Sequence, residues 1–128
     1  MLLSVQTSPG EFLDKLTILE IKSERISEPS KLANVRRELE MLRATWAASP
    51  LAARDVAALV AELKRVNETL WEVEDQLRAK ESARQFDAGF VELARTVYRT
   101  NDRRAAIKRE LNLTLGSELI EEKSYPHY

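Results

Sequence analysis

The stretch FVELARTVYRTNDRRAAIKRELNLTLG, from Phe90 to Gly116, decides the fold class, because its apolar residues recur at the spacing of an α-helix. The expected core stripe of this helix contains Phe90, Leu93, Ala94, Val97, Leu111 and Leu115. At about 100° per residue, Asn101, Lys108 and Asn112 fall inside the same stripe. Amide and ammonium groups are costly to bury unless they are hydrogen-bonded or paired. We therefore expect this helix either to build an internal polar network or to line a binding site.

Proline and capping signals divide the rest of the chain into three further helices. A serine that can cap a helix is followed by a proline, which suits the first turn, at Ser8-Pro9 and again at Ser49-Pro50. Glu11 stands at the capping-box position of the first helix. Pro29 is expected to end that helix, and Ser30 to begin the next one.

The third and fourth predicted helices are the longest. No glycine or proline occurs between Leu51 and Phe86, so the third helix could span about 45–50 Å at ~1.5 Å per residue. Asp87 can cap the fourth helix, with Phe86 and Val91 placed as a hydrophobic staple, and Gly116 can end it. The predicted helices span about residues 9–27, 30–48, 50–84 and 87–115, followed by a tail at 116–128.

These elements predict an all-α fold in one domain, residues 1–128. Short connections favour antiparallel neighbours, so we expect a four-helix antiparallel bundle with two long helices. Leu3 and Val5 alternate with polar residues, so the segment from Met1 to Thr7 could form a short strand.

The composition excludes several classes of function. Without cysteine, disulfides and thiolate metal sites are absent, and nothing indicates an oxidising compartment. A formal net charge of −1 argues against a nucleic-acid surface. No apolar run approaches the roughly 20 residues that cross a bilayer, and the segment from Met1 to Thr7 lacks the basic region of a signal peptide. We therefore expect a cytoplasmic protein that binds neither nucleic acid nor membrane.

The chain also lacks the residues of common catalytic sites. Its single histidine, His127, lies next to the C-terminus, where residues are usually mobile. No glycine-rich phosphate loop is present. We therefore expect no cofactor and no Ser-His, Cys-His or zinc chemistry.

Polar residues on three predicted helices could converge if these helices are mutual neighbours. The candidates are Asp14, Lys22 and Arg25 on the first helix, Asn67, Trp71 and Glu74 on the third, and Tyr98, Asn101, Lys108 and Asn112 on the fourth. In a functional interpretation, Lys22, Arg25 and Lys108 hold an anionic group, the asparagines orient it, and Trp71 or Tyr98 covers it. In a structural interpretation, the same residues form a satisfied network in which Glu74 pairs with Lys108 and the asparagines pair with each other.

Two pairs of carboxylates suggest a metal site. Glu20 and Glu24 share one helix face, as do Glu72 and Asp75, and magnesium prefers such oxygen ligands. This arrangement is similar to that of the all-helical nucleoside-triphosphate pyrophosphohydrolases, which hold metal with paired acidic residues on two helices. Surface ion pairing explains the same spacing more simply, so we predict no metal site, with Glu72 and Asp75 as the weaker candidates.

Four stretches of the chain together resemble a small bacterial family carried as a domain of unknown function. They are SPGEFLDKLTILEIKSERI (8–26), VNETLWEVEDQLRAKE (66–81), FVELARTVYRTNDRRAAIKRELN (90–112) and GSELIEEKSY (116–125). Members of that family often accompany glycosyltransferase or tetratricopeptide-repeat proteins, which implies a role near cell-envelope polysaccharide assembly. The resemblance carries no established activity. It does indicate which residues of the matching stretches to test, namely Asp14, Lys15, Lys22, Arg25, Asn67, Trp71, Glu74, Asp75, Asn101, Asp102, Lys108, Asn112 and residues 121–125.

Three functions remain open. The favoured one is a non-enzymatic interaction module that binds a protein partner through its long helical hairpin and tail, because no activated nucleophile is present. The first alternative is a protein or enzyme that binds an anionic small molecule in a polar interhelical site. The second is a magnesium-dependent nucleotide pyrophosphohydrolase. Trp46 and the apolar residues of the first helix could also support a homodimer.

Overall fold

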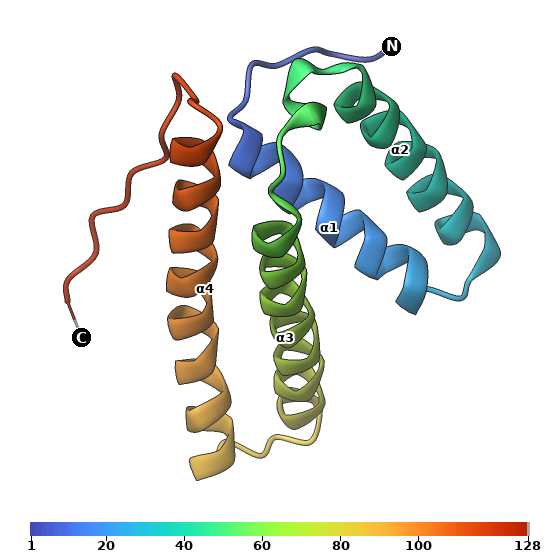
Figure 1. Cartoon of the computed structure of the whole chain (residues 1–128). Coiled ribbons are helices and arrows are strands. Elements are labelled where there is room, and N and C mark those ends of the chain that lie inside the picture. The colour runs from blue at the N-terminus through green and yellow to red at the C-terminus, as the bar shows by residue number, and fades with distance from the viewer. Residues whose placement is uncertain (128) are drawn as a thin grey trace.

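The computed structural model describes residues 1–127, and its regular elements are all helical. In chain order they are α1 (Pro9–Arg25), α2 (Pro29–Ala48), the short 3₁₀ helix η1 (Pro50–Ala53), α3 (Ala57–Ser82) and α4 (Ala88–Thr114) (Figure 1). The all-α prediction is confirmed for this part of the chain. No helix within residues 1–127 combines the length and the apolar character that crossing a bilayer requires.

The helices pack as a group of three with a fourth on one side. α3 and α4 form an antiparallel hairpin, and α1 crosses one half of it and contacts both helices (Figure 1). α2 contacts α1 and η1, and no other element that the structure describes. α1, α3 and α4 are therefore mutual neighbours, which is the condition for their polar residues to meet.

The core lies where α1 crosses the hairpin. It contains Leu13, Val56, Leu63, Ile107, Leu111 and Leu115. Trp46 packs against it from α2 and stacks on Phe12 with 5.9 Å between ring centroids. The expected dimer face around Trp46 is therefore partly occupied within the chain itself.

Three of the predicted helix ends are confirmed. The Ser8 hydroxyl caps α1 by accepting from the Glu11 amide at 3.2 Å, and the Asp87 carboxylate caps α4 by accepting from the Phe90 amide at 2.9 Å. Gly116 has a φ of 66° and ends α4, with the Ser117 amide donating to the Asn112 carbonyl at 2.9 Å. This is a Schellman motif, in which glycine takes the left-handed conformation without strain.

The predicted helix at 50–84 is wrong at its beginning. Ser49 caps η1 through the Leu51 amide at 3.1 Å, and α3 begins only at Ala57, where Asp55 accepts from the backbone amide at 3.3 Å. The break turns Val56 into the core. Asp55 is a residue type that favours helix starts, so the sequence carried a signal for this break besides glycine and proline.

Three other local predictions need correction. Pro29 does not end α1, which stops at Arg25; it is the first residue of α2, and Glu28 rather than Ser30 is the cap. The expected staple between Phe86 and Val91 does not form as a buried contact, because both side chains are exposed and Phe86 meets Phe90 edge-on.

The expected N-terminal strand is not formed. Residues 1–7 are irregular and exposed, and no strand occurs within residues 1–127. A single extended segment cannot satisfy its backbone groups without a neighbouring strand, so the alternation of Leu3 and Val5 was insufficient evidence.

A glycine allows the close approach of α1 and α4. The Gly10 amide donates to Asn112 Oδ1 at 2.7 Å. A Cβ atom on Gly10 would lie 2.5 Å from the Lys108 carbonyl oxygen and 2.9 Å from Asn112 Oδ1. Since one of these atoms belongs to the backbone of α4, a side chain at this position would force the two helices apart.

We predict that Gly10→Ala lowers the free energy of unfolding by about 2 kcal/mol, although alanine favours helices. The reason is the overlap with α4 and the loss of the Asn112 hydrogen bond. Urea denaturation followed by far-UV circular dichroism measures the change. Gly89→Ala is the matched control, because the nearest atom at 3.2 Å is the flexible end of Lys80. Equal effects of the two substitutions would contradict the prediction.

Candidate functional site

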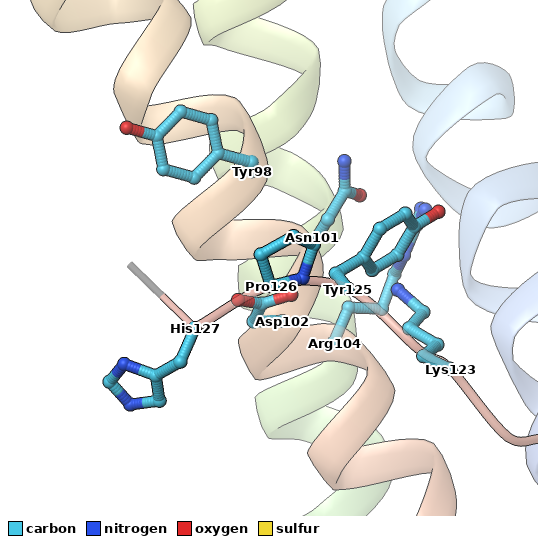
Figure 2. A pocket seen from close by; sticks show the side chains of 8 residues that line it. All are labelled: Tyr98, Asn101, Asp102, Arg104, Lys123, Tyr125, Pro126 and His127. Carbon is cyan, nitrogen blue, oxygen red and sulfur yellow. The ribbon is translucent and has the colours of Figure 1, made fainter.

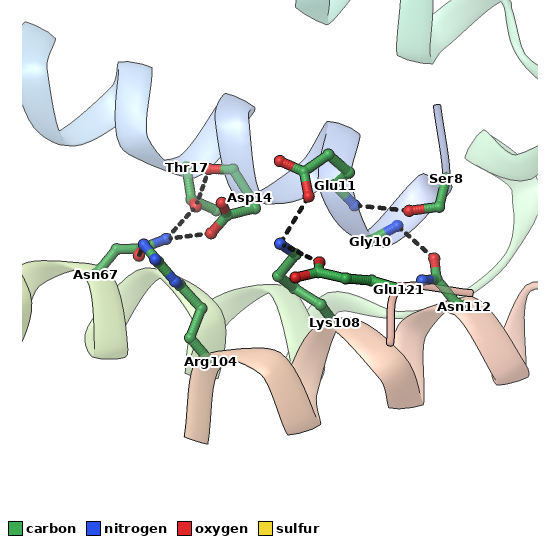
Figure 3. Close-up of polar contacts among 10 residues, drawn as sticks. All are labelled: Ser8, Gly10, Glu11, Asp14, Thr17, Asn67, Arg104, Lys108, Asn112 and Glu121. Carbon is green, nitrogen blue, oxygen red and sulfur yellow. Dashed lines mark hydrogen bonds and ion pairs between the residues drawn. The ribbon is translucent and has the colours of Figure 1, made fainter. Parts of the chain in front are cut away.

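Polar side chains join α1 to the hairpin in three successive contacts along α1 (Figure 3). The first contact is between Gly10 and Asn112, the second between Glu11 and Lys108, and the third involves Asp14, Thr17 and Asn67. We call these residues, with Arg104 and Glu121, the polar network. Every buried side-chain nitrogen or oxygen in the described residues has a hydrogen-bond partner.

The Asn112 side chain accepts a hydrogen bond from a backbone amide at the beginning of α1. Its side chain, 1% exposed, accepts from the Gly10 amide, while the Ser8 hydroxyl takes the amide of Glu11. The first amides of a helix have no partner within the helix, so a buried helix start needs such acceptors. The role of Asn112 in this structure is therefore that of a cap supplied by another helix.

Lys108 connects α1, α4 and the tail. Its Nζ atom lies 2.6 Å from Glu11 Oε2 and 2.9 Å from Glu121 Oε2, and its side chain is 10% exposed. Burial favours the neutral amine, but the hydrogen bonds to Glu11 and Glu121 and the charge of Asp14 outweigh it and raise the pKa of Lys108. The hydrogen bond from Lys108 in turn lowers the pKa of Glu121.

Three details of this contact correct the sequence analysis. The partners of Lys108 are Glu11 and Glu121, not Glu74, which pairs with Arg78 at 3.7 Å. Glu11 reaches Lys108 rather than completing a capping box with Ser8. The acidic tail is attached along α4, because Glu122 also pairs with Arg109 at 3.1 Å.

Asn67 brings together three helices. Its amide nitrogen donates to Asp14 Oδ1 at 2.9 Å and to Thr17 Oγ1 at 3.1 Å on α1. Its oxygen accepts from Arg104 Nη1 at 3.2 Å on α4. The two asparagines thus bond to different groups and not to each other. Thr17 and Arg104 are network members that the sequence analysis missed, although Arg104 lies one helical turn from Lys108 on the same face.

Several predicted residues line a cavity between the three helices. This interhelical cavity has a volume of about 390 Å³. It is lined by Ile18, Ile21 and Lys22 of α1, by Asn67, Leu70, Trp71, Glu74, Asp75 and Arg78 of α3, and by Arg104 of α4. Four of the ten predicted site residues, Lys22, Asn67, Trp71 and Glu74, are therefore brought together here.

A second cavity lies between α4 and the tail. It has a volume of about 750 Å³, and Figure 2 shows its lining residues, which are Tyr98, Asn101, Asp102, Arg104, Lys123, Tyr125, Pro126 and His127. Tyr98 and Asn101 are therefore separated from the other predicted residues. We call this the tail cavity; Arg104 lines both cavities.

The remaining predicted residues line neither of these two cavities. Asp14, Lys108 and Asn112 are buried in the polar network. Arg25 lies outside, 3.2 Å from Glu72 and 3.9 Å from Glu68, so it does not join Lys22 and Lys108 in holding an anion as expected.

Three of the four residues in the acidic pairs form ion pairs between helices, whereas Asp75 lines the interhelical cavity. Glu20 lies 3.7 Å from Arg43, Glu24 lies 3.0 Å from Lys64, and Glu72 is held by Arg25. Within residues 1–127, no group of three His, Cys, Asp or Glu residues is placed to hold a metal ion.

We predict that Asn67→Leu lowers the free energy of unfolding by about 3 kcal/mol, because it leaves the buried Asp14 carboxylate without its side-chain donor. Urea denaturation measures the change. Asn101→Leu is the matched control: Asn101 is half-buried on α4, and its side chain has no hydrogen bond to another described residue. In the double variant Asp14→Leu, Asn67→Leu, part of the loss should be recovered. A loss with Asn101→Leu as large as that with Asn67→Leu would refute this account.

We predict that the tail detaches in acid. Because the folded-state pKa of Glu121 is lowered, its contribution is fully present above the ordinary glutamate pKa of about 4.3 and is lost as the pH falls through the lowered value. Nuclear magnetic resonance relaxation of the amides at 120–122 measures the release. Glu121→Gln should release the tail already at neutral pH, whereas Glu118→Gln, at an exposed site with no ion pair to a described residue, should behave as the parent chain. A Glu121→Gln tail that stays docked would count against the prediction.

Comparison with known proteins identifies the family of this chain but assigns it no activity. A profile of the family of unknown function DUF6165 matches residues 3–127, which includes every helix and both cavities. Neither the curated proteins nor the solved structures contain a match to the chain. Since the profile covers nearly the whole sequence, the chain belongs to the family of unknown function DUF6165.

Proposed function

We propose that the protein is a non-enzymatic interaction module whose α3–α4 hairpin binds a helical part of another protein. The observation that carries this proposal concerns the free end of the hairpin, residues 74–106, which we call the hairpin tip. No residue of the hairpin tip is buried, whereas Leu63 and Ile107, in the half that α1 crosses, are 0% exposed.

The hairpin tip has an apolar seam that two helices cannot cover. Leu77, Phe90, Leu93 and Val97 are all half-buried. Phe86, Val91 and Tyr98 beside them are 59%, 53% and 42% exposed. Helix pairs become stable bundles when a third or fourth helix covers the seam, and exposed apolar patches commonly mark binding surfaces. An amphipathic helix of a partner would supply this cover.

The charges of the hairpin tip support apolar recognition. Lys80 pairs with Asp87 at 3.1 Å, and Glu92 pairs with Arg95 at 3.4 Å and with Arg99 at 3.7 Å. These charges compensate one another within the tip. An exposed ion pair contributes little to binding, so we assign the affinity to the apolar residues.

The resemblance given above suggests which partner to test. It implies a bacterial protein that accompanies glycosyltransferase or tetratricopeptide-repeat proteins, and the composition favours the cytoplasm; we extend the proposal to one of these proteins as the partner. Repeat proteins of that kind are helical, as the uncovered seam requires. Because Trp46 stacks on Phe12 within the chain, we place any homodimer at the hairpin tip as well.

We predict that Val91→Glu weakens partner binding by more than about tenfold, because it places a charge in an apolar contact that excludes water. The measurement is co-purification of the tagged chain with its partner, followed by titration calorimetry with the purified partner. Leu113→Glu is the matched control, since Leu113 is 64% exposed on the same helix but outside the hairpin tip.

The outcomes separate the alternatives. Retention of the same partner by the parent chain and by Leu113→Glu, with its loss from Val91→Glu, supports the proposal. Sedimentation velocity identifies the case in which the partner is a second copy. Recovery of the chain alone as a monomer, or undiminished binding by Val91→Glu, contradicts the proposal.

A further inference from the structure

Three of the five cations that are withdrawn from water in the described residues are paired with a carboxylate. Of the chain's 20 lysines and arginines, five are not exposed: Lys22, Lys64, Lys80, Arg104 and Lys108. Lys64, Lys80 and Lys108 each have a carboxylate oxygen within 3.1 Å. Lys22 and Arg104 have no carboxylate of a described residue within the 4.0 Å limit of an ion pair.

These two unpaired cations meet at one place. Lys22 on α1 and Arg104 on α4 both line the interhelical cavity. Withdrawing a cation from water without a counter-charge is unfavourable. The chain pairs its other half-buried and buried cations with carboxylates. Lys22 and Arg104 lack such a pair although Glu74 and Asp75 line the same cavity, so an added anion could supply their counter-charge.

Arg104 is held in position by groups that are themselves fixed. Its Nη1 atom donates to Asn67 Oδ1 at 3.2 Å, and the Asn67 amide is held by Asp14 and Thr17. A guanidinium group has five N–H donors in a planar fork, and this contact uses one of its nitrogens. The remaining N–H groups of Arg104 can bind an anion at little entropic cost, because the side chain is already held by Asn67.

Part of the cavity lining is apolar, namely Ile18, Ile21, Leu70 and Trp71. The cavity volume of about 390 Å³ lies within the usual range of small-molecule sites. Two acidic residues, Glu74 and Asp75, also belong to the lining, and Glu74 is paired with Arg78 at 3.7 Å. The cavity therefore combines three cations and two carboxylates with an aromatic and aliphatic surface.

We propose that the interhelical cavity binds a small organic anion, whose phosphate or carboxylate lies between Lys22 and Arg104 and whose ring packs against Trp71. The cavity shares Glu74, Asp75, Arg78 and Arg104 with residues 74–106 but none of the apolar residues of the hairpin-tip seam, so this proposal does not depend on partner binding there. This site replaces the expected cradle of Lys22, Arg25 and Lys108, because Arg25 and Lys108 already have carboxylate partners.

Trp71 provides a direct signal of binding. The chain has two tryptophans, so Trp46→Phe leaves Trp71 as the only indole, in a background where a phenyl ring can still stack on Phe12. The probes are phenyl phosphate and benzoate, which distinguish the two anionic groups, phenol, which has the ring without the charge, and inorganic phosphate, which has the charge without the ring. Calorimetry on the unaltered chain repeats each titration.

We expect phenyl phosphate or benzoate to change the Trp71 emission saturably and to raise the melting temperature. Phenol and inorganic phosphate should each bind at least about tenfold more weakly. Lys22→Met and Arg104→Met should each reduce the affinity about tenfold, as loss of a charge-assisted hydrogen bond does. The matched controls Lys31→Met and Arg36→Met, at exposed sites on α2, should not change it.

The same variants separate a binding role from a structural one. Lys22→Met removes an unpaired half-buried charge, so without ligand its melting temperature should equal or exceed that of Lys31→Met. Loss of binding without loss of stability supports the site. The proposal is overturned if neither anionic probe binds, if Lys22→Met binds as tightly as Lys31→Met, or if phenol or inorganic phosphate binds as tightly as the ring-bearing anions.

Discussion

The rest of the structure depends on the close contact between the first turn of α1 and the last turns of α4. Gly10 has no side chain there, so its amide reaches Asn112 and the backbones approach closely. This approach brings Glu11 to Lys108, and one helical turn further on it brings Asp14 to Asn67. Because α1 is fixed against both helices of the hairpin, Lys22 of α1 and Arg104 of α4 line the same cavity.

Much of the fold could be predicted from local chemistry. Serine and aspartate just before a helix commonly cap it, as Ser8 and Asp87 do here. Glycine commonly ends a helix in the left-handed conformation, as Gly116 does. The break before α3 could not be predicted from glycine and proline alone, since neither occurs there; Asp55 accepts from the Ala57 amide and Val56 is buried in the core. The segment at 1–7 alternates like a strand but lacks a neighbouring strand, which periodicity does not reveal.

Part of the polar network could be predicted from the sequence, but its pairing could not. Of the three polar residues placed within the apolar stripe, Lys108 and Asn112 are buried and Asn101 is half-buried. Their partners depend on the crossing of α1 and on the course of the tail, and neither has a periodic signal in the sequence. Glu121 therefore looked like part of a solvated tail, and Arg104 was not considered because nothing in one helix shows that it faces an asparagine of another.

Because of its position, α2 should unfold more easily than the unit formed by α1, α3 and α4. α2 rests on α1 and η1 alone, and Leu39 is its only buried residue. Local opening costs the free energy of the interfaces that it breaks, and detachment of α2 leaves the contacts among α1, α3 and α4 in place. Amide hydrogens of α2 should therefore exchange with solvent through a partial unfolding that spares the three-helix unit. We therefore expect α1, α3 and α4 to stay packed together while α2 opens independently.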